Sequence, residues 1–311
     1  MHPSHLILRP GTRTMRALSG GWGRLGVLVL LLACGSDSPA PAAGPSRVLF
    51  YSERDGNAEI YVMNADGTAA ERLTFHSASD IDPDISPDGR TIVFTSDRDG
   101  DRDIYTMPIT VGEPTNLTSN EVDDGWPRWS PDGQRIVFHT NRDGDYEIYS
   151  MAADGSSLVR LTSHEGPDVF PDWTPDGTQL LFRRDLDVWI ANADGTEPRR
   201  LTEREGGDQM AVASPDGRMV ATGSGRDGYF AVYLMNADGS QQRSLTPLAP
   251  GADTAGFLNG WPAWSRDGRL FMTSAGPETG GDPEIFVMNA DGSGRVRLTT
   301  TPGMDGSPRP F

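Results

Sequence analysis

The hydrophobic positions of this chain fall in short, regularly spaced runs that are separated by polar turn residues. A representative unit reads Trp126-Pro-Arg-Trp-Ser-Pro-Asp-Gly133, followed by the apolar run Ile136-Val-Phe138. Short apolar runs bounded by Gly, Pro and Asp are typical of β-strands, and a run without alternation is typical of a strand buried on both faces. The pattern therefore predicts an all-β chain of short strands.

Local chemistry divides this unit into four strands, expected at residues 127–130, 136–139, 147–151 and 159–162. Ser-Pro-Asp-Gly is a turn sequence with Pro at its second position and Gly at its fourth. Asn-Arg-Asp-Gly connects the second and third strands as a hairpin loop, and Ala-Asp-Gly connects the third and fourth.

The unit recurs along the chain. The glycine that closes the first turn appears five times, at steps of 44, 44, 40 and 51 residues: Gly89, Gly133, Gly177, Gly217 and Gly268. A second marker, Leu-Thr, appears six times, beginning at Leu73, Leu117, Leu161, Leu201, Leu245 and Leu298. A period in the low forties with several strands per unit is typical of the blades of a β-propeller.

The two ends of the repeat region complement each other. Residues 47–51 read as a second strand that lacks a first strand before it, and residues 305–311 match the first strand at 124–130 and then stop. We therefore predict that the C-terminal strand completes the first blade and removes an open sheet edge. The prediction is a six-bladed β-propeller of four-stranded blades over residues 47–311.

The N-terminal segment predicts a secreted, anchored protein. Residues 25–33 form an apolar run after Arg16 and Arg24, and nine residues are too few to span a bilayer, which takes roughly 20. Residues 1–33 are thus expected to be a signal peptide. The only cysteine, Cys34, follows Leu-Leu-Ala in a setting that resembles the lipobox of bacterial lipoproteins, and Gly35 after it implies sorting to the periplasmic face of the outer membrane. The alternative is an ordinary signal peptide with a chance cysteine.

Composition restricts the choice of partner. Residues 34–46 are rich in Pro, Ala and Ser and are expected to form a flexible tether after the lipidated cysteine. Four of the 27 basic residues lie in 1–33, which leaves 23 Arg against 44 acidic residues, a formal net charge of −21, without any Lys. This balance argues against nucleic acid and against electrostatic docking on anionic lipid. It fits a basic partner or simply a soluble acidic surface.

Ser-Pro-Asp-Gly, Ile-Tyr, Ala-Asp-Gly and Leu-Thr, which recur in this order along the chain, resemble the repeats of TolB-type β-propellers, also described as WD40-like or PD40 repeats. The resemblance covers residues 47–311 and implies the fold. It does not choose a function, because such blades serve periplasmic scaffolds, peptidase propeller domains and some lyases. TolB itself is soluble and carries an α/β domain before its propeller, whereas in this chain the predicted tether occupies that place.

A polar residue stands three positions before each marker proline or its counterpart: Asp80, Asp124, Asp168, Asp208, Asn259 and Asp305. Because this position reads as the entry to the innermost strand, six such groups could ring one mouth of the central channel and bind a cation, a basic peptide or a polar ligand. The alternative is that each side chain caps the turn into its own strand by accepting backbone N–H bonds.

Aromatic residues directly precede the marker proline in three repeats: Trp126, Phe170 and Trp261. They should lie near the same mouth and are candidates for contact with a partner, where Trp is enriched. Buried packing is the alternative. A second set, Trp129, Trp173 and Trp264, has the opposite side-chain parity and is expected to pack between blades.

Motifs for catalysis and metal binding are weak in this chain. The Asp-rich hairpins at 97–103 and 141–147 place Gly at the fourth position, where a calcium loop needs it at the sixth. His76, His139 and His164 are spaced too irregularly for a metal triad, and no Gly-x-Ser-x-Gly elbow exists. The prediction is a monomeric, lipid-anchored propeller that binds a cell-envelope protein or peptide at a channel mouth, with no cofactor and no reaction. The alternative is a metal-assisted lyase or hydrolase that uses the channel carboxylates.

Overall fold

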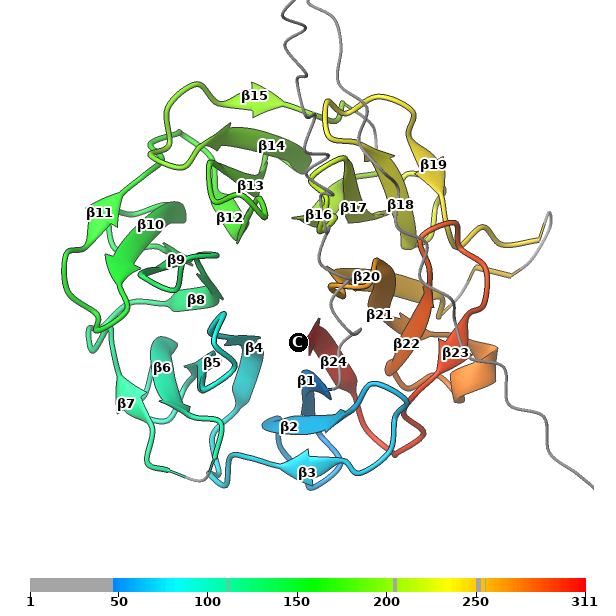
Figure 1. Ribbon diagram of the computed structural model, residues 1–311, viewed down its shortest axis with the longest axis horizontal. Coiled ribbons are helices and arrows are strands. Elements are labelled where there is room, and N and C mark those ends of the chain that lie inside the picture. The colour runs from blue at the N-terminus through cyan, green and yellow to red at the C-terminus, as the bar shows by residue number, and fades with distance from the viewer. Residues whose placement is uncertain (1–46, 111, 204–205, 250–252, 255) are drawn as a thin grey trace, which may run out of the picture. The chain divides into compact units, whose positions relative to one another are not determined.

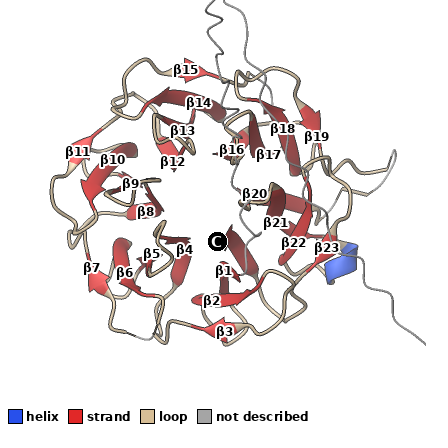
Figure 2. Ribbon diagram, viewed as in Figure 1, coloured by secondary structure: helices blue, strands red, loops and turns tan. Residues whose placement is uncertain are grey.

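The repeat region folds into six four-stranded antiparallel sheets arranged around a central axis (Figure 1). The computed structural model describes residues 47–110, 112–203, 206–249, 253–254 and 256–311. Within these ranges the only helical element is a single 3₁₀ turn, Pro277–Thr279, in the connection before the third strand of the last blade (Figure 2). The all-β prediction is confirmed.

In each blade the strands follow one another from the innermost, at the channel, to the outermost. Blade 1 contains β24 (Asp305–Pro310), β1 (Arg47–Ser52), β2 (Glu59–Asn64) and β3 (Glu71–Arg72). Blade 2 contains β4 (Asp80–Ile85), β5 (Thr91–Ser96), β6 (Asp103–Pro108) and β7 (Thr115–Asn116). Blade 3 contains β8 (Asp124–Trp129), β9 (Arg135–Thr140), β10 (Glu147–Ala152) and β11 (Val159–Arg160). Blade 4 contains β12 (Asp168–Trp173), β13 (Gln179–Arg184), β14 (Asp187–Asn192) and β15 (Arg199–Arg200). Blade 5 contains β16 (Asp208–Ala213), β17 (Met219–Ser224), β18 (Ala231–Asn236) and β19 (Arg243–Ser244). Blade 6 contains β20 (Leu258–Trp264), β21 (Arg269–Ala275), β22 (Glu284–Asn289) and β23 (Val296–Arg297).

The ring closes as the sequence predicts. The C-terminal strand β24 pairs antiparallel with β1, with Ser52 opposite Asp305 and Val48 opposite Pro310. The pairing extends beyond the strand, because the Glu53 N–H donates to the Met304 carbonyl at 2.9 Å. Blade 1 is therefore assembled from both ends of the repeat region, and β1 is left with no open edge.

The recurring motifs each satisfy backbone groups. In blade 3 the Gly133 N–H donates to the Ser130 carbonyl, and the Ser130 hydroxyl donates to Asp132 while accepting the Arg135 N–H at 2.9 Å. Gly133 adopts φ 70°, a left-handed conformation that favours glycine. The Ser-Pro-Asp-Gly copies are thus turns whose Ser and Asp replace backbone hydrogen-bond partners.

The threonine of the Leu-Thr marker binds the outer edge of a blade to the strand before it through hydrogen bonds. The Thr162 hydroxyl accepts the Ile148 N–H at 2.9 Å and donates to the buried Glu147 carboxylate at 2.6 Å. Arg160 binds the other oxygen of Glu147 at 2.9 Å. The outermost strand β11 is only two residues long, shorter than the predicted 159–162, because this side-chain network takes over after Arg160. A short outer strand also offers little edge for association.

Hydrophobic layers fill the spaces between blades. Ile136 and Phe138 pack against Val93 and Ile104 of blade 2, and the opposite face of the same sheet places Val137 against Trp173 of blade 4. Both faces of the central strands are therefore buried, which explains their unbroken apolar runs. Trp129, Trp173 and Trp264 belong to these layers.

The predicted signal peptide at 1–33, Cys34 and the tether up to residue 46 lie outside the described residues. Within the described part, no helix is long and apolar enough to cross a membrane.

Candidate binding site at the channel mouth

A bulge interrupts every innermost strand shortly after its first residue. In blade 3 the register with β9 shifts between Gly125 and Arg128, and the extra residue is Trp126. The residues at the equivalent positions are Asp82, Trp126, Phe170, Met210, Trp261 and Ser307. All except Met210 have positive φ, between 48° and 57°. Such a conformation costs roughly 1–2 kcal/mol for a residue with a side chain, so the ring of blades holds bulky groups in a strained backbone at the channel.

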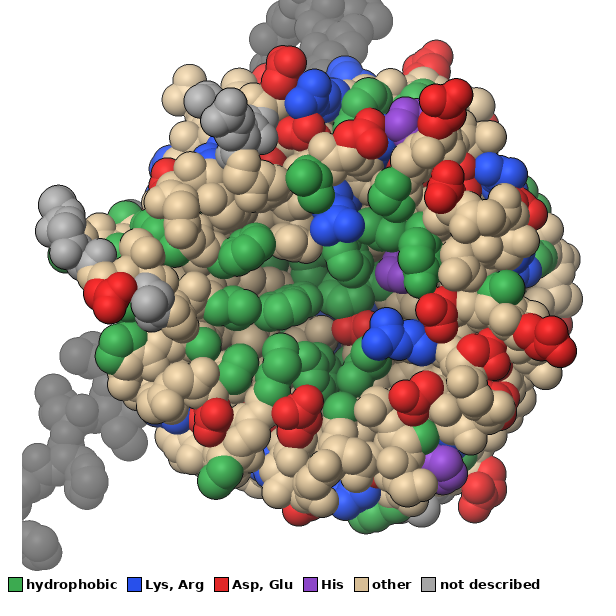
Figure 3. All heavy atoms as spheres, turned by 180° about the vertical axis from the view of Figure 1, so that it is seen from behind, with side chains coloured by type: hydrophobic (Ala, Val, Ile, Leu, Met, Phe, Trp, Pro, Cys, Tyr) green, Lys and Arg blue, Asp and Glu red, His purple; other side chains and the backbone are tan. Residues whose placement is uncertain are grey.

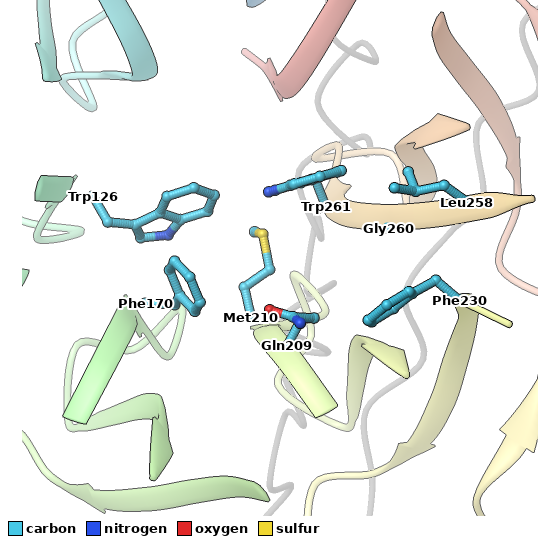
Figure 4. A pocket seen from close by; sticks show the side chains of 8 residues that line it. All are labelled: Trp126, Phe170, Gln209, Met210, Phe230, Leu258, Gly260 and Trp261. Carbon is cyan, nitrogen blue, oxygen red and sulfur yellow. The ribbon is translucent and has the colours of Figure 1, made fainter. Parts of the chain in front are cut away.

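Four of these bulge residues converge on one apolar cavity of about 170 Å³ (Figure 4). Its walls come from blades 3 to 6 and comprise Trp126, Phe170, Gln209, Met210, Phe230, Leu258, Gly260 and Trp261. Trp126 and Phe170 meet edge to face with ring centroids 4.9 Å apart. On the face of the molecule shown in Figure 3, apolar side chains gather around a central hollow. Aromatic residues around a concave apolar space are typical of a binding pocket.

The other side of the mouth is polar. A second cavity of about 240 Å³ is lined partly by Asp82, Arg102, Asp123, His139 and Tyr146, and it shares Trp126, Phe170 and Trp261 with the apolar cavity. The His139 ring stands edge-on to Tyr146 at 5.2 Å, and its Nδ1 accepts the Phe170 N–H at 3.3 Å. Burial, helped by the nearby Arg102, lowers the pKa of His139 to about 3. His139 is therefore neutral and carries its proton on Nε2.

Charged side chains form a floor beneath the mouth. Arg309 of blade 1 extends across the channel to Asp172 of blade 4, with 3.0 Å between Nη2 and Oδ2, and its Nε lies 4.0 Å from Asp84 of blade 2. Arg128 lies in the same layer, donates Nη1–H to the Asp82 carbonyl at 3.2 Å, and is almost fully buried. Burial raises the pKa of Asp82 and Asp84 to about 6. Burial, with the nearby charge of Asp84, raises the pKa of Asp172 to about 7.

This floor predicts an unusual pH dependence of stability. Because the folded pKa values of Asp82, Asp84 and Asp172 lie above the value near 3.9 of an unfolded Asp, the folded state binds more protons between about pH 4 and 7. The free energy of unfolding should therefore rise as the pH falls from about 8 to about 5, by roughly 5 kcal/mol for the three carboxyls together. Urea unfolding at a series of pH values measures it.

The control for this prediction is Asp172→Asn, which removes the carboxyl with the highest of the three pKa values. Its profile should be flatter than that of the parent chain. Arg128 and Arg309 are the charged groups that face Asp172 along with Asp84. The turn carboxylates with lowered pKa, such as Asp132, titrate below this window and do not mask the effect. A parent profile that is flat or rises toward pH 8 would contradict the prediction.

The six polar residues singled out in the sequence occupy equivalent places but are held inside their own blades. All six are buried. Five are carboxylates that each pair with an arginine of the same blade: Arg98–Asp80 at 2.8 Å, Arg142–Asp124 at 3.0 Å, Arg184–Asp168 at 2.6 Å, Arg226–Asp208 at 2.8 Å and Arg54–Asp305 at 3.1 Å. Asn259 accepts the Ser274 hydroxyl at 2.8 Å. The hydrogen-bond donors to these carboxylates are side chains and not the backbone N–H groups of the capping alternative, and Asp124 also reaches the edge of the polar cavity.

The arginines of these pairs also stack on the aromatic residues of the blade. The Arg142 guanidinium lies 5.1 Å from the Tyr149 ring centroid and 5.7 Å from that of Phe138. The Tyr149 hydroxyl donates to Asp143 of the same hairpin loop. The Arg-Asp-Gly hairpin thus ties the second and third strands to the start of the innermost one. Asp143 and Glu147 of the acidic hairpin that suggested calcium have local partners.

The fold brings the three predicted aromatic residues together: Trp126, Phe170 and Trp261 all line both cavities. Met210 was missed by sequence reasoning, although it stands two residues after Asp208 as Trp126 stands two after Asp124. Phe230 and Leu258 carry no repeat signal, because Phe230 stands directly before β18 and Leu258 begins β20, outside the recurring motifs. Within the described residues, no group of three or more His, Cys, Asp or Glu side chains is placed to hold a metal ion.

Comparison with known proteins agrees with this architecture. A family model described as the TolB beta propeller domain, PD40, matches residues 33–125 and 121–187. The chain is a TolB-type β-propeller. The Tol-Pal system protein TolB of Syntrophotalea carbinolica is 42% identical over 48 residues, which is 15% of this chain and only 11% of that relative.

Solved structures extend the likeness to the rest of the propeller. TolB from Acinetobacter baumannii superimposes with a TM-score of 0.73 at 20% identity, over 87% of this chain and 67% of that one. An oligogalacturonate lyase from Vibrio parahaemolyticus superimposes with a TM-score of 0.55 at 17% identity, over 81% of this chain and 74% of the lyase. At these identities the likeness concerns the fold alone.

Proposed function

We propose that this TolB-type propeller is a cell-envelope scaffold that binds a protein or peptide at the channel mouth and carries out no reaction of its own. The observation that carries the proposal is the convergence of Trp126, Phe170, Met210 and Trp261 on one apolar cavity. Strained backbone persists where the surrounding structure enforces it, and it clusters at functional sites. Aromatic side chains in such a pocket are the usual anchors of protein interfaces.

The same proposal includes an anchor through Cys34 on the periplasmic face of the outer membrane and a partner from the cell envelope. The lipobox-like setting of Cys34 and the name of the matching relative, a Tol-Pal system protein, support this placement. The tether of residues 36–46 would let the channel mouth reach a partner. The chain is expected to act as a monomer and to bind no nucleic acid.

The alternative, a metal-assisted lyase or hydrolase, draws support from the fold shared with an oligogalacturonate lyase. It would need carboxylates free to bind a metal ion or move a proton. The carboxylates at the strand entries are each engaged by an arginine, and those of the channel floor lie beside Arg128 and Arg309. Binding without chemistry therefore has the stronger support.

Trp261→Gly tests the site without the usual loss of stability. Trp261 is only partly buried and sits at φ 48°, where glycine is unstrained, so the change removes an aromatic wall and relieves the backbone together. We expect the melting temperature to stay within about 3 °C of the parent, since lost packing and relieved strain offset each other at roughly 1–2 kcal/mol each. Capture of envelope proteins by the propeller, quantified by mass spectrometry, should fall at least tenfold.

A matched control is Phe75→Ala, which removes an exposed aromatic residue that lines neither cavity. It should leave capture unchanged. If Trp261→Gly captures the same proteins in the same amounts as the parent, the channel mouth is not the binding site.

A further inference from the structure

Arg183 of β13 is a half-buried cation that has no carboxylate partner in the part of the chain that the structure describes. Its Nη1–H donates to the Gln209 side-chain oxygen at 3.1 Å, and its guanidinium lies 4.8 Å from the Phe170 ring centroid. Among the described residues, no Asp or Glu lies within ion-pair distance of it. The next residue, Arg184, is fully engaged by Asp168 through two hydrogen bonds of 2.6 and 2.7 Å.

The two residues that Arg183 touches, Gln209 and Phe170, are both walls of the apolar cavity. Desolvation lowers the pKa of Arg183, and no acid among the described residues opposes that effect. A partly desolvated guanidinium is costly to leave without a counter-charge. In a chain with 44 acidic residues, an arginine without a counter-charge among the described residues, at the edge of an apolar cavity, therefore points to a ligand group that those residues do not supply.

The other polar groups around the cavity are also donors. The Trp126 indole Nε1–H is buried, and no acceptor is present for it within the described residues. Because the Gln209 oxygen accepts from Arg183, the Gln209 amide nitrogen is left as a donor. Three hydrogen-bond donors beside an apolar space are complementary to a ligand that carries oxygen acceptors together with an apolar group.

We propose that the apolar cavity recognises an apolar side chain accompanied by a carboxylate on the same or the next residue of a peptide segment, with Arg183 as the carboxylate-binding group. This rests on the proposed function and adds the chemistry of the ligand. The Arg183 guanidinium stacks on Phe170 of the cavity wall, 4.8 Å from its ring centroid. The carboxylate and the apolar group of the ligand must therefore be close neighbours. A charge-assisted hydrogen bond at a partly water-excluded site is stronger than a neutral one. The overall negative charge suggested a basic partner, whereas the cavity selects an acidic group locally.

A matched pair of probes tests the proposal: N-acetyl-L-phenylalanine and its carboxamide, which differ only in the carboxylate. Tryptophan fluorescence reports binding, because Trp126 and Trp261 line the cavity and the probes do not absorb at the excitation wavelength of tryptophan. We expect the acid to bind the full propeller about tenfold more tightly than the amide. Arg183→Gln should reduce the affinity for the acid to that for the amide and leave the amide unaffected. Arg183→Lys should keep part of the preference.

Controls separate this inference from the proposed function. Arg266→Gln removes an arginine that lines neither cavity and should change neither affinity. Equal binding of acid and amide to the parent chain, with both abolished by Trp261→Gly, would overturn the role of Arg183 and keep the binding site. Binding of neither probe to the parent would overturn both. Loss of acid and amide alike in Arg183→Gln, with an unchanged melting curve, would show that Arg183 only shapes the cavity and would also overturn the carboxylate assignment.

Discussion

Deleting residues 305–311 is expected to remove most of the stability of the propeller. The seven residues supply the whole of β24, the innermost strand of blade 1, and without them β1 becomes an open edge facing the channel. The deletion also leaves Arg54 without Asp305 and Asp172 without Arg309. The missing innermost strand and the two broken ion pairs should lower the free energy of unfolding by roughly 5 kcal/mol or more. At about 2–4 °C per kcal/mol, the melting temperature should fall by roughly 10–20 °C. Thermal melting followed by circular dichroism measures it.

Two comparisons make this result specific to ring closure. Arg309→Met keeps the strand and removes only the ion pairs of Arg309 with Asp172 and Asp84, so it should lose much less stability than the deletion. A synthetic peptide of residues 305–311, added to the truncated chain, should restore part of the melting temperature by mass action. A truncated chain that melts within about 3 °C of the parent would show that the ring does not depend on this strand.

Asp168→Ala is expected to be the most destabilising of the single changes considered. The Asp168 carboxylate is fully buried and bound by both Nε and Nη2 of Arg184, whose side chain is only 9% exposed. Removing one partner of a buried pair leaves the other charge uncompensated, which costs about 3–5 kcal/mol. Urea unfolding should show this loss as a lower midpoint with an unchanged slope.

The matched control is Asp185→Ala in the same blade, where the carboxylate is 59% exposed and its partner His164 lies 3.8 Å away. It should cost less than about 1 kcal/mol. The pair of variants also addresses the metal-dependent alternative. If divalent ions raise the melting temperature of the parent chain and not that of Asp168→Ala, this carboxylate acts as a metal ligand. An Asp168→Ala chain as stable as the parent would contradict the structural role that its buried pair indicates.

The aromatic cavity was only partly predictable. Trp126, Phe170 and Trp261 share one position in the repeat, and that position alone suggested a place near the mouth. The bulge that turns them into the channel has no signature in these residues, because a left-handed backbone at Trp or Phe is disfavoured locally and is imposed by the surrounding blades. Leu258 and Phe230, which also line the wall, are paired by an isolated parallel β-bridge that the repeat pattern does not contain.

The polar residues form a clear sequence pattern, but the pattern does not say what their side chains do. Their regular recurrence at Asp80, Asp124 and the equivalent positions is equally compatible with a ring of ligands and with six copies of one structural device. The two possibilities are distinguished by one contact in each blade. It joins the polar residue of the innermost strand to an arginine some 16 to 18 residues later, as between Asp124 and Arg142. Sequence spacing does not report such a contact, because it depends on how two hairpins of one sheet are aligned.

The sequence by itself determined the architecture. Turn chemistry, a period in the low forties and unbroken apolar runs are local properties, and six agreeing copies specified blades, strands and the closure of the ring by residues 305–311. Only the tertiary structure decided what the channel contains. The ion pair between Arg309 and Asp172 joins two blades that are far apart in the chain, and Arg183 reaches across to Gln209 of the next blade. Such contacts depend on the positions of whole blades around a common axis, which no local pattern encodes.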